Sequence, residues 1–178
     1  VNPASGRRDA APDEHVRVEY YDVRGPTWNA LREQIESKGP EGWWGVTQSG
    51  TSYHMDMRMT AEGCVGESVR VTSDARVRLP NWADRYEGPR RLQAYWDGVI
   101  RTLDLHERGH VQINLDGSRE VERALKSIPP MSSCDALRDE ARRRFQEIRA
   151  SIARRQAAYD EETNHGRRQW TPYRDDGR

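Results

Sequence analysis

One short stretch of the chain carries the residues best suited to chemistry. Residues 105–111 read Leu-His-Glu-Arg-Gly-His-Val, so His106 and His110 stand four residues apart and Glu107 directly follows the first. On an α-helix a four-residue step turns the side chain by only about 40°, which places both imidazoles on one face, one turn apart. Two imidazole nitrogens so placed can bind one zinc ion, and Glu107 then lies where it can take a proton from water. The H-E-x-x-H motif therefore predicts a metal-dependent hydrolase.

The residues around the motif predict a helix that buries this face. We expect the helix to run from Arg90 to about Ile128, with Asp116-Gly117 as the place where it could be interrupted. The alternative is that both histidines lie on the surface of a polar helix. We favour the buried arrangement because buried polar groups need partners, and a metal supplies them. The apolar residues that share the stripe of the motif are Trp96, Val99, Ile100, Leu103, Ile113, Gly117, Val121, Ala124 and Leu125.

A catalytic zinc site needs a third protein ligand and an open position for water. Asp116 stands at the spacing of the third ligand in one class of H-E-x-x-H enzymes, although Ile113 occupies the place of the glycine in that class. Glu120 or Glu122 could serve if the chain turned back after Gly117. The apolar spacing around both glutamates favours a continued helix instead, with both pointing outward.

His165 is the remaining candidate for the third ligand. It follows the last long helix, which could return the chain to the site. Asn164 before it and Gly166 after it favour a tight turn that would aim the imidazole. From the residues alone, Asp116, the two glutamates and His165 all stay open.

The rest of the chain predicts an α+β domain in which a small antiparallel or mixed sheet packs on the motif helix and a long C-terminal helix. Residues 16–23 read as a strand, and residues 28–38 as a helix that begins after Thr27. Alternating residues over 53–60 and 65–79 predict an antiparallel hairpin. A last long helix is expected to begin at Ser132 or Ser133.

The composition of the chain predicts a single domain with a polar segment at each end. We expect a flexible arm at residues 1–14, a single catalytic domain at 15–170 and a polar tail at 171–178. The 29 basic and 29 acidic residues cancel, which gives no electrostatic reason to bind nucleic acid or an anionic membrane. No apolar run approaches the ~20 residues of a membrane span. The chain begins at Val1 rather than Met and shows no signal peptide, as expected of a mature form. No sequence pattern indicates an oligomeric state.

The chain has two cysteines, Cys64 and Cys134, which are not in a C-x-x-C arrangement. A cytosolic chain would keep both as buried thiols, whereas an oxidising compartment would allow a disulfide. We favour the bridge, which would close a loop of about 70 residues and add about 4 kcal/mol of stability.

Four segments of the chain stand in a recognisable order over residues 20–166. They are Tyr20-Tyr21-Asp22-Val23-Arg24-Gly25, the Cys64 strand ending in Leu79-Pro80-Asn81-Trp82, His106-Glu107-Arg108-Gly109-His110, and Tyr159-Asp160 with Thr163-Asn164-His165-Gly166. In these segments the chain resembles a bacterial family of predicted secreted zinc-dependent proteases, catalogued as a domain of unknown function. The resemblance implies a zincin-like metallopeptidase fold, a secreted or periplasmic location, a Cys64–Cys134 bridge and His165 as third ligand.

Peptide-bond hydrolysis is the function that we expect. Zn²⁺ held by His106, His110 and His165 would polarise a water molecule, and Glu107 would act as general base. The hairpin could offer an edge strand to an extended peptide or protein substrate. Two rival hypotheses are a metal-dependent amidase that acts on cell-wall peptides and a non-catalytic zinc-containing binding module.

Further residues are expected around the metal. We favour Asp160 as the residue that orients a ligand imidazole, with Asp116 and Asp104 as alternatives. Tyr159 or Tyr173 could hydrogen-bond the oxyanion. The segment Gly42-Trp43-Trp44-Gly45 is expected in a core or turn, with a substrate-binding surface as the alternative.

Overall fold

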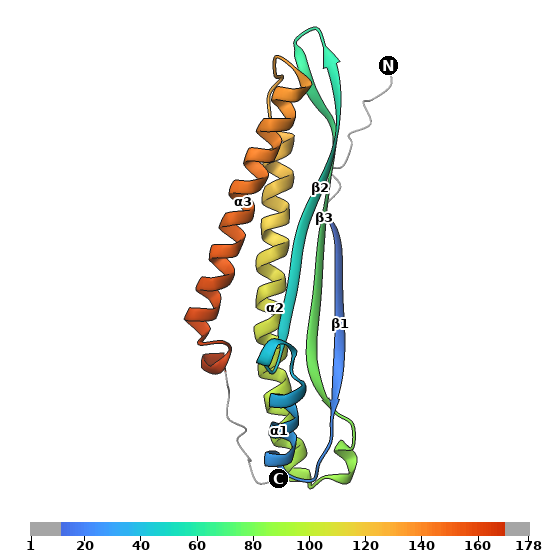
Figure 1. Ribbon diagram of the computed structural model, residues 1–178, viewed down its shortest axis with the longest axis vertical. Helices are drawn as coiled ribbons and strands as arrows, with labels where there is room; N and C mark the ends of the chain where they lie inside the picture. Colours follow the sequence, from blue (N-terminus) through green and yellow to red (C-terminus); the bar gives the residue numbers. More distant parts are fainter. Residues whose placement is uncertain (1–11, 170–178) are drawn as a thin grey trace, which may run out of the picture.

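The computed structural model describes residues 12–169 as a long three-stranded sheet with two long helices on one side (Figure 1). The predicted tail at 171–178 and most of the predicted arm at 1–14 lie outside the described residues. The first strand begins at Asp13. The elements are β1 (Asp13–Val23), α1 (Trp28–Lys38), η1 (Pro40–Gly42), β2 (Val46–Thr60), β3 (Gly63–Trp82), η2 (Arg85–Glu87), α2 (Arg90–Lys126), α3 (Cys134–Thr163) and η3 (Arg167–Gln169), where η marks a 3₁₀ turn.

The sheet is mixed, with β3 in the centre and the order β1-β3-β2. Strand β1 runs parallel to β3, with Val16 opposite Ala75, and β2 runs antiparallel to it, with Tyr53 opposite Val71. The predicted hairpin and the predicted α+β class with a small mixed sheet are therefore confirmed. Strand β2 begins at Val46, which is earlier than the alternation of the sequence indicated.

The first half of β2 does not show the hydrophobic alternation of a strand, because its inward-facing residues are polar. The hydroxyl of Thr51 lies 2.8 Å from Ser118 Oγ and 3.3 Å from Asn114 Oδ1, both on α2. Asn114 also donates to Ser73 Oγ of β3 at 2.7 Å. These buried polar groups pair with one another, so the interior tolerates them without the apolar alternation of an ordinary half-buried strand.

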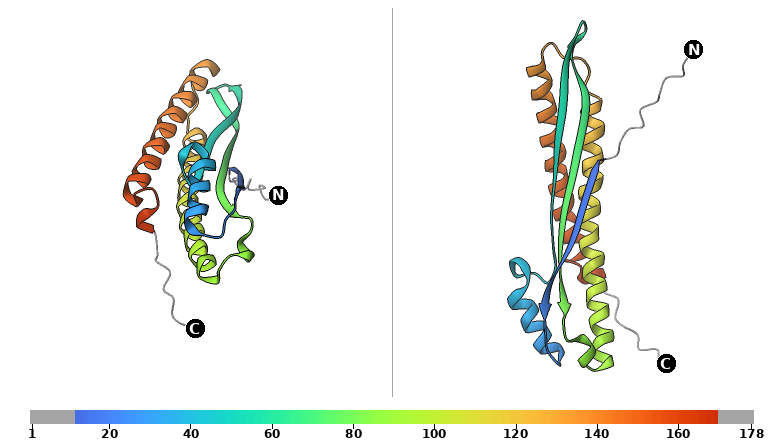
Figure 2. Two further views of the ribbon diagram at one scale, coloured as in Figure 1. Left: turned by 60° about the horizontal axis from the view of Figure 1, so that its bottom comes forward. Right: turned by 90° about the vertical axis from the view of Figure 1, so that its right-hand side faces the viewer.

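Helix α2 is continuous from Arg90 to Lys126, so the interruption considered near Asp116-Gly117 does not occur. Gly117 has a packing role instead. A Cβ atom at this position would lie 2.3 Å from the side chain of Ile152 on α3. Glycine therefore allows α3 to approach α2 closely, and the two helices lie side by side in Figures 1 and 2.

Hydroxyl caps fix the starts of α1 and α3 as predicted. The hydroxyl of Thr27 accepts a hydrogen bond from the backbone of Ala30, and that of Ser133 accepts one from Ala136. Helix α1 packs at the end of the sheet where β1 and β3 finish (Figure 2), and Leu31 and Ile35 are fully buried there. Within residues 12–169, no helix is long and apolar enough to cross a membrane.

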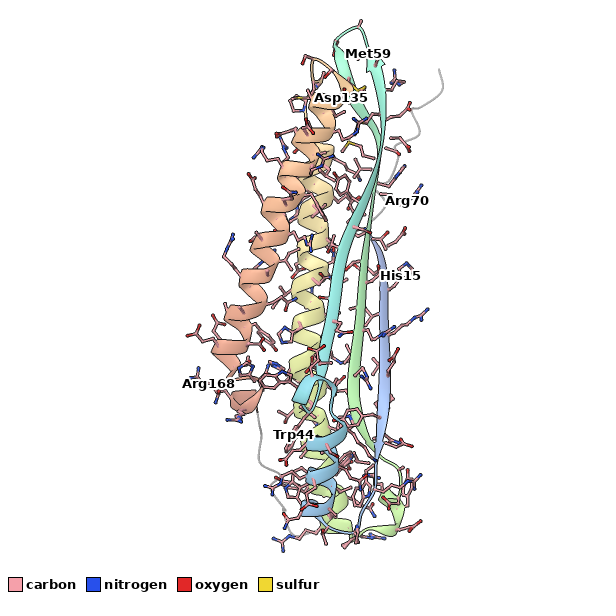
Figure 3. The ribbon with its side chains drawn as sticks, in the orientation of Figure 1. His15, Trp44, Met59, Arg70, Asp135 and Arg168 are labelled. Atoms are coloured by element: carbon pink, nitrogen blue, oxygen red, sulfur yellow. A yellow bond between two sulfur atoms is a disulfide. The ribbon has the colours of Figure 1, made fainter. Side chains whose placement is uncertain are left out.

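Cys64 and Cys134 form a disulfide, which confirms the predicted bridge. The bond joins the start of β3 to the start of α3, at the end of the molecule where Figure 3 labels Met59 and Asp135. Trp44 and Arg168 lie toward the other end.

Replacing both cysteines by serine is expected to lower the free energy of unfolding by about 4 kcal/mol, because the bridge restricts a 70-residue segment of the unfolded chain. Urea unfolding with and without the bridge measures this change. Metal affinity of the folded double variant should stay unchanged, because the bridge lies far from the site described below. An unaltered free energy of unfolding would contradict this prediction.

Candidate metal centre

Three possible ligand atoms converge between α2 and α3. His106 Nε2 and His110 Nε2 lie 3.2 Å apart. Asp160 Oδ1, from the last turns of α3, lies 3.2 Å from the first nitrogen and 3.1 Å from the second. Within the described residues these are the side chains whose ligand atoms gather as a possible metal group.

The spacing of these atoms fits a metal ion. In a tetrahedral zinc site with bonds of about 2.0–2.1 Å, two ligand atoms are separated by roughly 3.3 Å. The distances of 3.1 to 3.2 Å among the three atoms come close to that value. A donor set of two imidazole nitrogens and one carboxylate oxygen suits zinc and other first-row divalent ions.

Glutamine side chains hold both imidazoles in the orientation that a metal needs. His110 Nδ1 donates to Gln156 Oε1 at 2.5 Å, and Gln156 Nε2 donates to the carbonyl of His110 at 3.0 Å. His106 Nδ1 donates to Gln169 Oε1 at 3.1 Å. Because an amide oxygen only accepts, each Nδ1 carries the proton and each Nε2 directs a lone pair toward the other ligand atoms.

Burial also favours the metal-binding form of His106, which is only 6% exposed. Burial lowers the pKa of His106, and the nearby charge of His110 lowers it further. A histidine with a lowered pKa stays neutral at physiological pH and keeps its lone pair for a metal.

Gln156→Leu is expected to weaken zinc affinity about 10- to 100-fold, the usual effect of losing a residue that orients a metal ligand. Competition with a coloured chelator measures the affinity. Gln112→Leu is the matched control, since Gln112 lies on α2 and bonds to Asp116 rather than to a ligand. Equal affinities of the two variants would show that the amide does not orient His110.

Glu107 is buried beside the three atoms, with 3% of its surface exposed. Thr47 of β2 donates to Glu107 Oε2 at 2.6 Å. Gly45 lies against the other oxygen, since a Cβ there would lie 3.0 Å from Oε1. Burial raises the pKa of the Glu107 carboxyl, although the hydrogen bond from Thr47 acts in the opposite direction. A carboxylate with a raised pKa is a stronger proton acceptor.

The three candidate ligand residues, Glu107 and the two residues that contact its carboxylate border one cleft of about 1170 Å³. His106, Glu107 and His110 reach it from α2 and Asp160 reaches it from α3, while residues 42–49 form the facing wall. The start of edge strand β2 is therefore directly beside the candidate metal centre. Such a cleft has room for several residues of an extended chain.

His165 lies next to this centre but outside the group of three. Its Nδ1 is 3.5 Å from Asp160 Oδ1, and its ring stacks on Trp43 with the centroids 4.8 Å apart. Asn164 and His165 both have positive φ angles, 49° and 51°, which form the expected tight turn. The residue that completes the group with the two histidines is therefore Asp160, for which the sequence predicts an orienting role, and not His165. His165 as a ligand stays a prediction.

The other acidic candidates lie outside the site. Asp116 bonds to Gln112 and Arg119 and is half exposed. Each of the others pairs with a basic residue elsewhere on α2 or on α3, and none lines the cleft. These pairs are Asp104–Arg108, Glu120–Arg155 and Glu122–Lys126.

Tyr159 packs against the ring of His106. Its ring stacks on His106 with the centroids 5.1 Å apart, and its hydroxyl accepts a hydrogen bond from Gln169 at 2.8 Å. Gly109 makes room for it, because a Cβ there would lie 2.1 Å from the hydroxyl oxygen. Tyr159 is not among the residues that line the cleft, and a role for it at an oxyanion stays a prediction. Tyr173, the other candidate, lies outside the described residues.

Sequence reasoning missed Thr47, Gln156 and Gln169. A signal existed for one of them. Gln156, Asp160 and Thr163 recur at spacings of four and three, so they share one face of α3. A polar stripe on a face that must pack against another helix indicates partners within the protein.

The fold and the site define an α+β domain with a candidate metal centre between two long helices. A family model described as "Bacterial protein of unknown function (DUF922)" matches residues 18–166, and the chain belongs to this family. The match covers most of the chain and includes every residue of the candidate centre except Gln169. No curated protein and no solved structure matches the chain.

Proposed function

We propose that the protein is a zinc-dependent metallopeptidase with a zincin-like active site. The convergence of His106, His110 and Asp160 beside the buried Glu107 carries this proposal. Glu107 lines the same cleft as His106, His110 and Asp160. A general base next to two or more metal ligands is the arrangement that H-E-x-x-H hydrolases use.

The side chains have separate roles in this mechanism. His106, His110 and Asp160 would hold the zinc ion, with His165 beside Asp160 as a candidate additional ligand. Zinc, when bound, supplies a Lewis acid that polarises water and the scissile carbonyl. Glu107 accepts a proton from the attacking water and passes it to the leaving amine. Thr47 fixes the orientation of the carboxylate through Oε2.

Strand β2 supports a peptide as the substrate. Within residues 12–169 it pairs only with β3, and the residues from Val46 to Ser49 line the cleft. An extended peptide could hydrogen-bond to this free edge as a further strand and pass beside Glu107. The disulfide supports a secreted or periplasmic location, where such bonds persist.

The test compares two substrates, an unfolded protein and purified cell-wall peptide fragments, with and without a chelator. We expect peptide bonds of the unfolded protein to be cleaved, with activity lost on chelation and restored by zinc. Mass spectrometry identifies the products. Cleavage of the cell-wall fragments alone would assign the rival amidase activity. Stoichiometric zinc without cleavage of either substrate would favour the binding module and contradict the proposal.

A further inference from the structure

One end of the cleft has aromatic walls. Trp28 of α1, Trp44 before β2 and Tyr95 of α2 line this end, together with Val99 and Leu103. The ring centroid of Trp28 lies 5.7 Å from that of Trp44 and 4.8 Å from that of Tyr95, both in edge-to-face geometry. Trp28, Trp44 and Tyr95 are referred to below as the aromatic compartment.

The compartment is aligned with the candidate general base. Tyr95, Val99, Leu103 and Glu107 recur every four residues of α2, so they form one ridge along the helix. At a rise of 1.5 Å per residue, Leu103 lies roughly 6 Å and Tyr95 roughly 18 Å from Glu107 along the helix axis. An extended peptide advances about 3.3 Å per residue, so its side chains within about five positions of the cleaved bond can reach this end.

The rings of the compartment differ from the tryptophans of the core. Trp82 and Trp96 are 3% and 4% exposed, whereas Tyr95 is 38% exposed, and Trp28 and Trp44 are both partly exposed. The backbone at Trp44 is held in place, because the buried Tyr21 hydroxyl donates a hydrogen bond to the carbonyl of Trp44 at 2.7 Å. A partly exposed aromatic wall held in place in this way is a preformed binding surface.

We propose that the aromatic compartment is a recognition subsite for one bulky apolar side chain, aromatic or large aliphatic, of an extended peptide that passes along β2. The inference rests on the proposed function for the course of the peptide past Glu107, but binding itself requires no turnover. The walls favour a side chain over a sugar ring. Val99 and Leu103 extend the aromatic surface with aliphatic side chains, which suit an apolar group better than the hydroxyl groups of a sugar.

The test measures binding to the zinc-loaded Glu107→Gln variant, which should not consume the peptide. Two sets of extended peptides differ at a single position, which carries phenylalanine or serine and is moved stepwise along the chain. Calorimetry gives each dissociation constant. At one position within five residues of the centre, we expect the phenylalanine peptide to bind about 10- to 30-fold more tightly, as burial of one large apolar side chain predicts.

Variants of Tyr95 assign the preference to the compartment. Tyr95→Ala should reduce the preference to about threefold or less, while Tyr95→Phe keeps the ring and should retain it. Tyr86→Ala is the control, since Tyr86 is 88% exposed and does not line the cleft. If Tyr95→Ala fails to fold, Tyr95→Gln takes its place in the Glu107→Gln background, because glutamine keeps much of the side-chain volume but removes the ring.

The outcomes separate the subsite from the peptidase proposal. Equal affinity for phenylalanine and serine peptides at every position would overturn the subsite, as would a preference that survives Tyr95→Ala. Tighter binding of a cell-wall glycan fragment than of any peptide would also overturn it. If the preference is present but the parent protein cleaves no peptide, the subsite stands and the peptidase fails. If the parent protein cleaves both peptides with equal kcat/KM, the peptidase stands and the subsite fails.

Discussion

Glu107→Gln is expected to lower kcat/KM for peptide cleavage by on the order of 10³-fold while the protein still binds zinc, since general bases contribute about 10²- to 10⁴-fold. Glutamine has the same shape and can still accept the hydrogen bond from Thr47, but it cannot take a proton from water. The loss of rate therefore reports the chemical role of the carboxylate rather than a change of fold.

The measurement combines turnover of a labelled peptide with the zinc content of the purified variant. Asp104→Asn is the matched control, because Asp104 lies on the same helix but pairs with Arg108 outside the cleft. This control should retain the activity of the parent protein. If Glu107→Gln also retained full turnover, another group would have to be the base.

Asp160→Ala is expected to weaken zinc affinity by more than about 100-fold, which exceeds the usual effect of changing a residue outside the ligand set. Asp160 Oδ1 is the atom that completes the group formed by the two Nε2 atoms. Its loss would remove the proposed third ligand and the negative charge next to two imidazoles. His165→Ala should weaken zinc affinity by less than about 10-fold, because its ring lies beside Asp160 and outside that group.

Competition titrations with a chelator measure both affinities, and X-ray absorption counts the nitrogen ligands of the bound zinc. Asp116→Ala is the control, since this carboxylate bonds to Gln112 and Arg119 on the surface of α2. The opposite order, with His165→Ala far more damaging than Asp160→Ala, would assign the third position to His165. That result would agree with the ligand set implied by the family resemblance.

Local signals in the sequence sufficed for several elements of the fold. The 3.6-residue period placed α2 correctly, and hydroxyl caps marked the starts of α1 at Thr27 and of α3 at Ser133. The first half of β2 could not be recognised in this way. Its inward residues Thr47 and Thr51 are polar because they meet Glu107, Asn114 and Ser118 of α2, so the alternation that marks a strand is missing beside the site.

The polar partners of the site depend on contacts between distant segments. Gln156 and Gln169 hold the two imidazoles, yet they lie 46 and 63 residues beyond the histidines that they orient. Nothing in the local sequence states which amide meets which ring. Only the polar stripe on α3 indicated that this face has partners within the protein.

The sequence alone determined that His106, Glu107 and His110 share one helical face, because the geometry of a single helix fixes side chains four residues apart. Tertiary structure decided which residue of α3 faces the two histidines and completes the group of possible ligand atoms. The position of α3 along α2 selects Asp160, and that position depends on close contacts such as Tyr159 against Gly109 and Ile152 against Gly117. Such contacts follow from packing two helices against each other, which no spacing within either helix specifies.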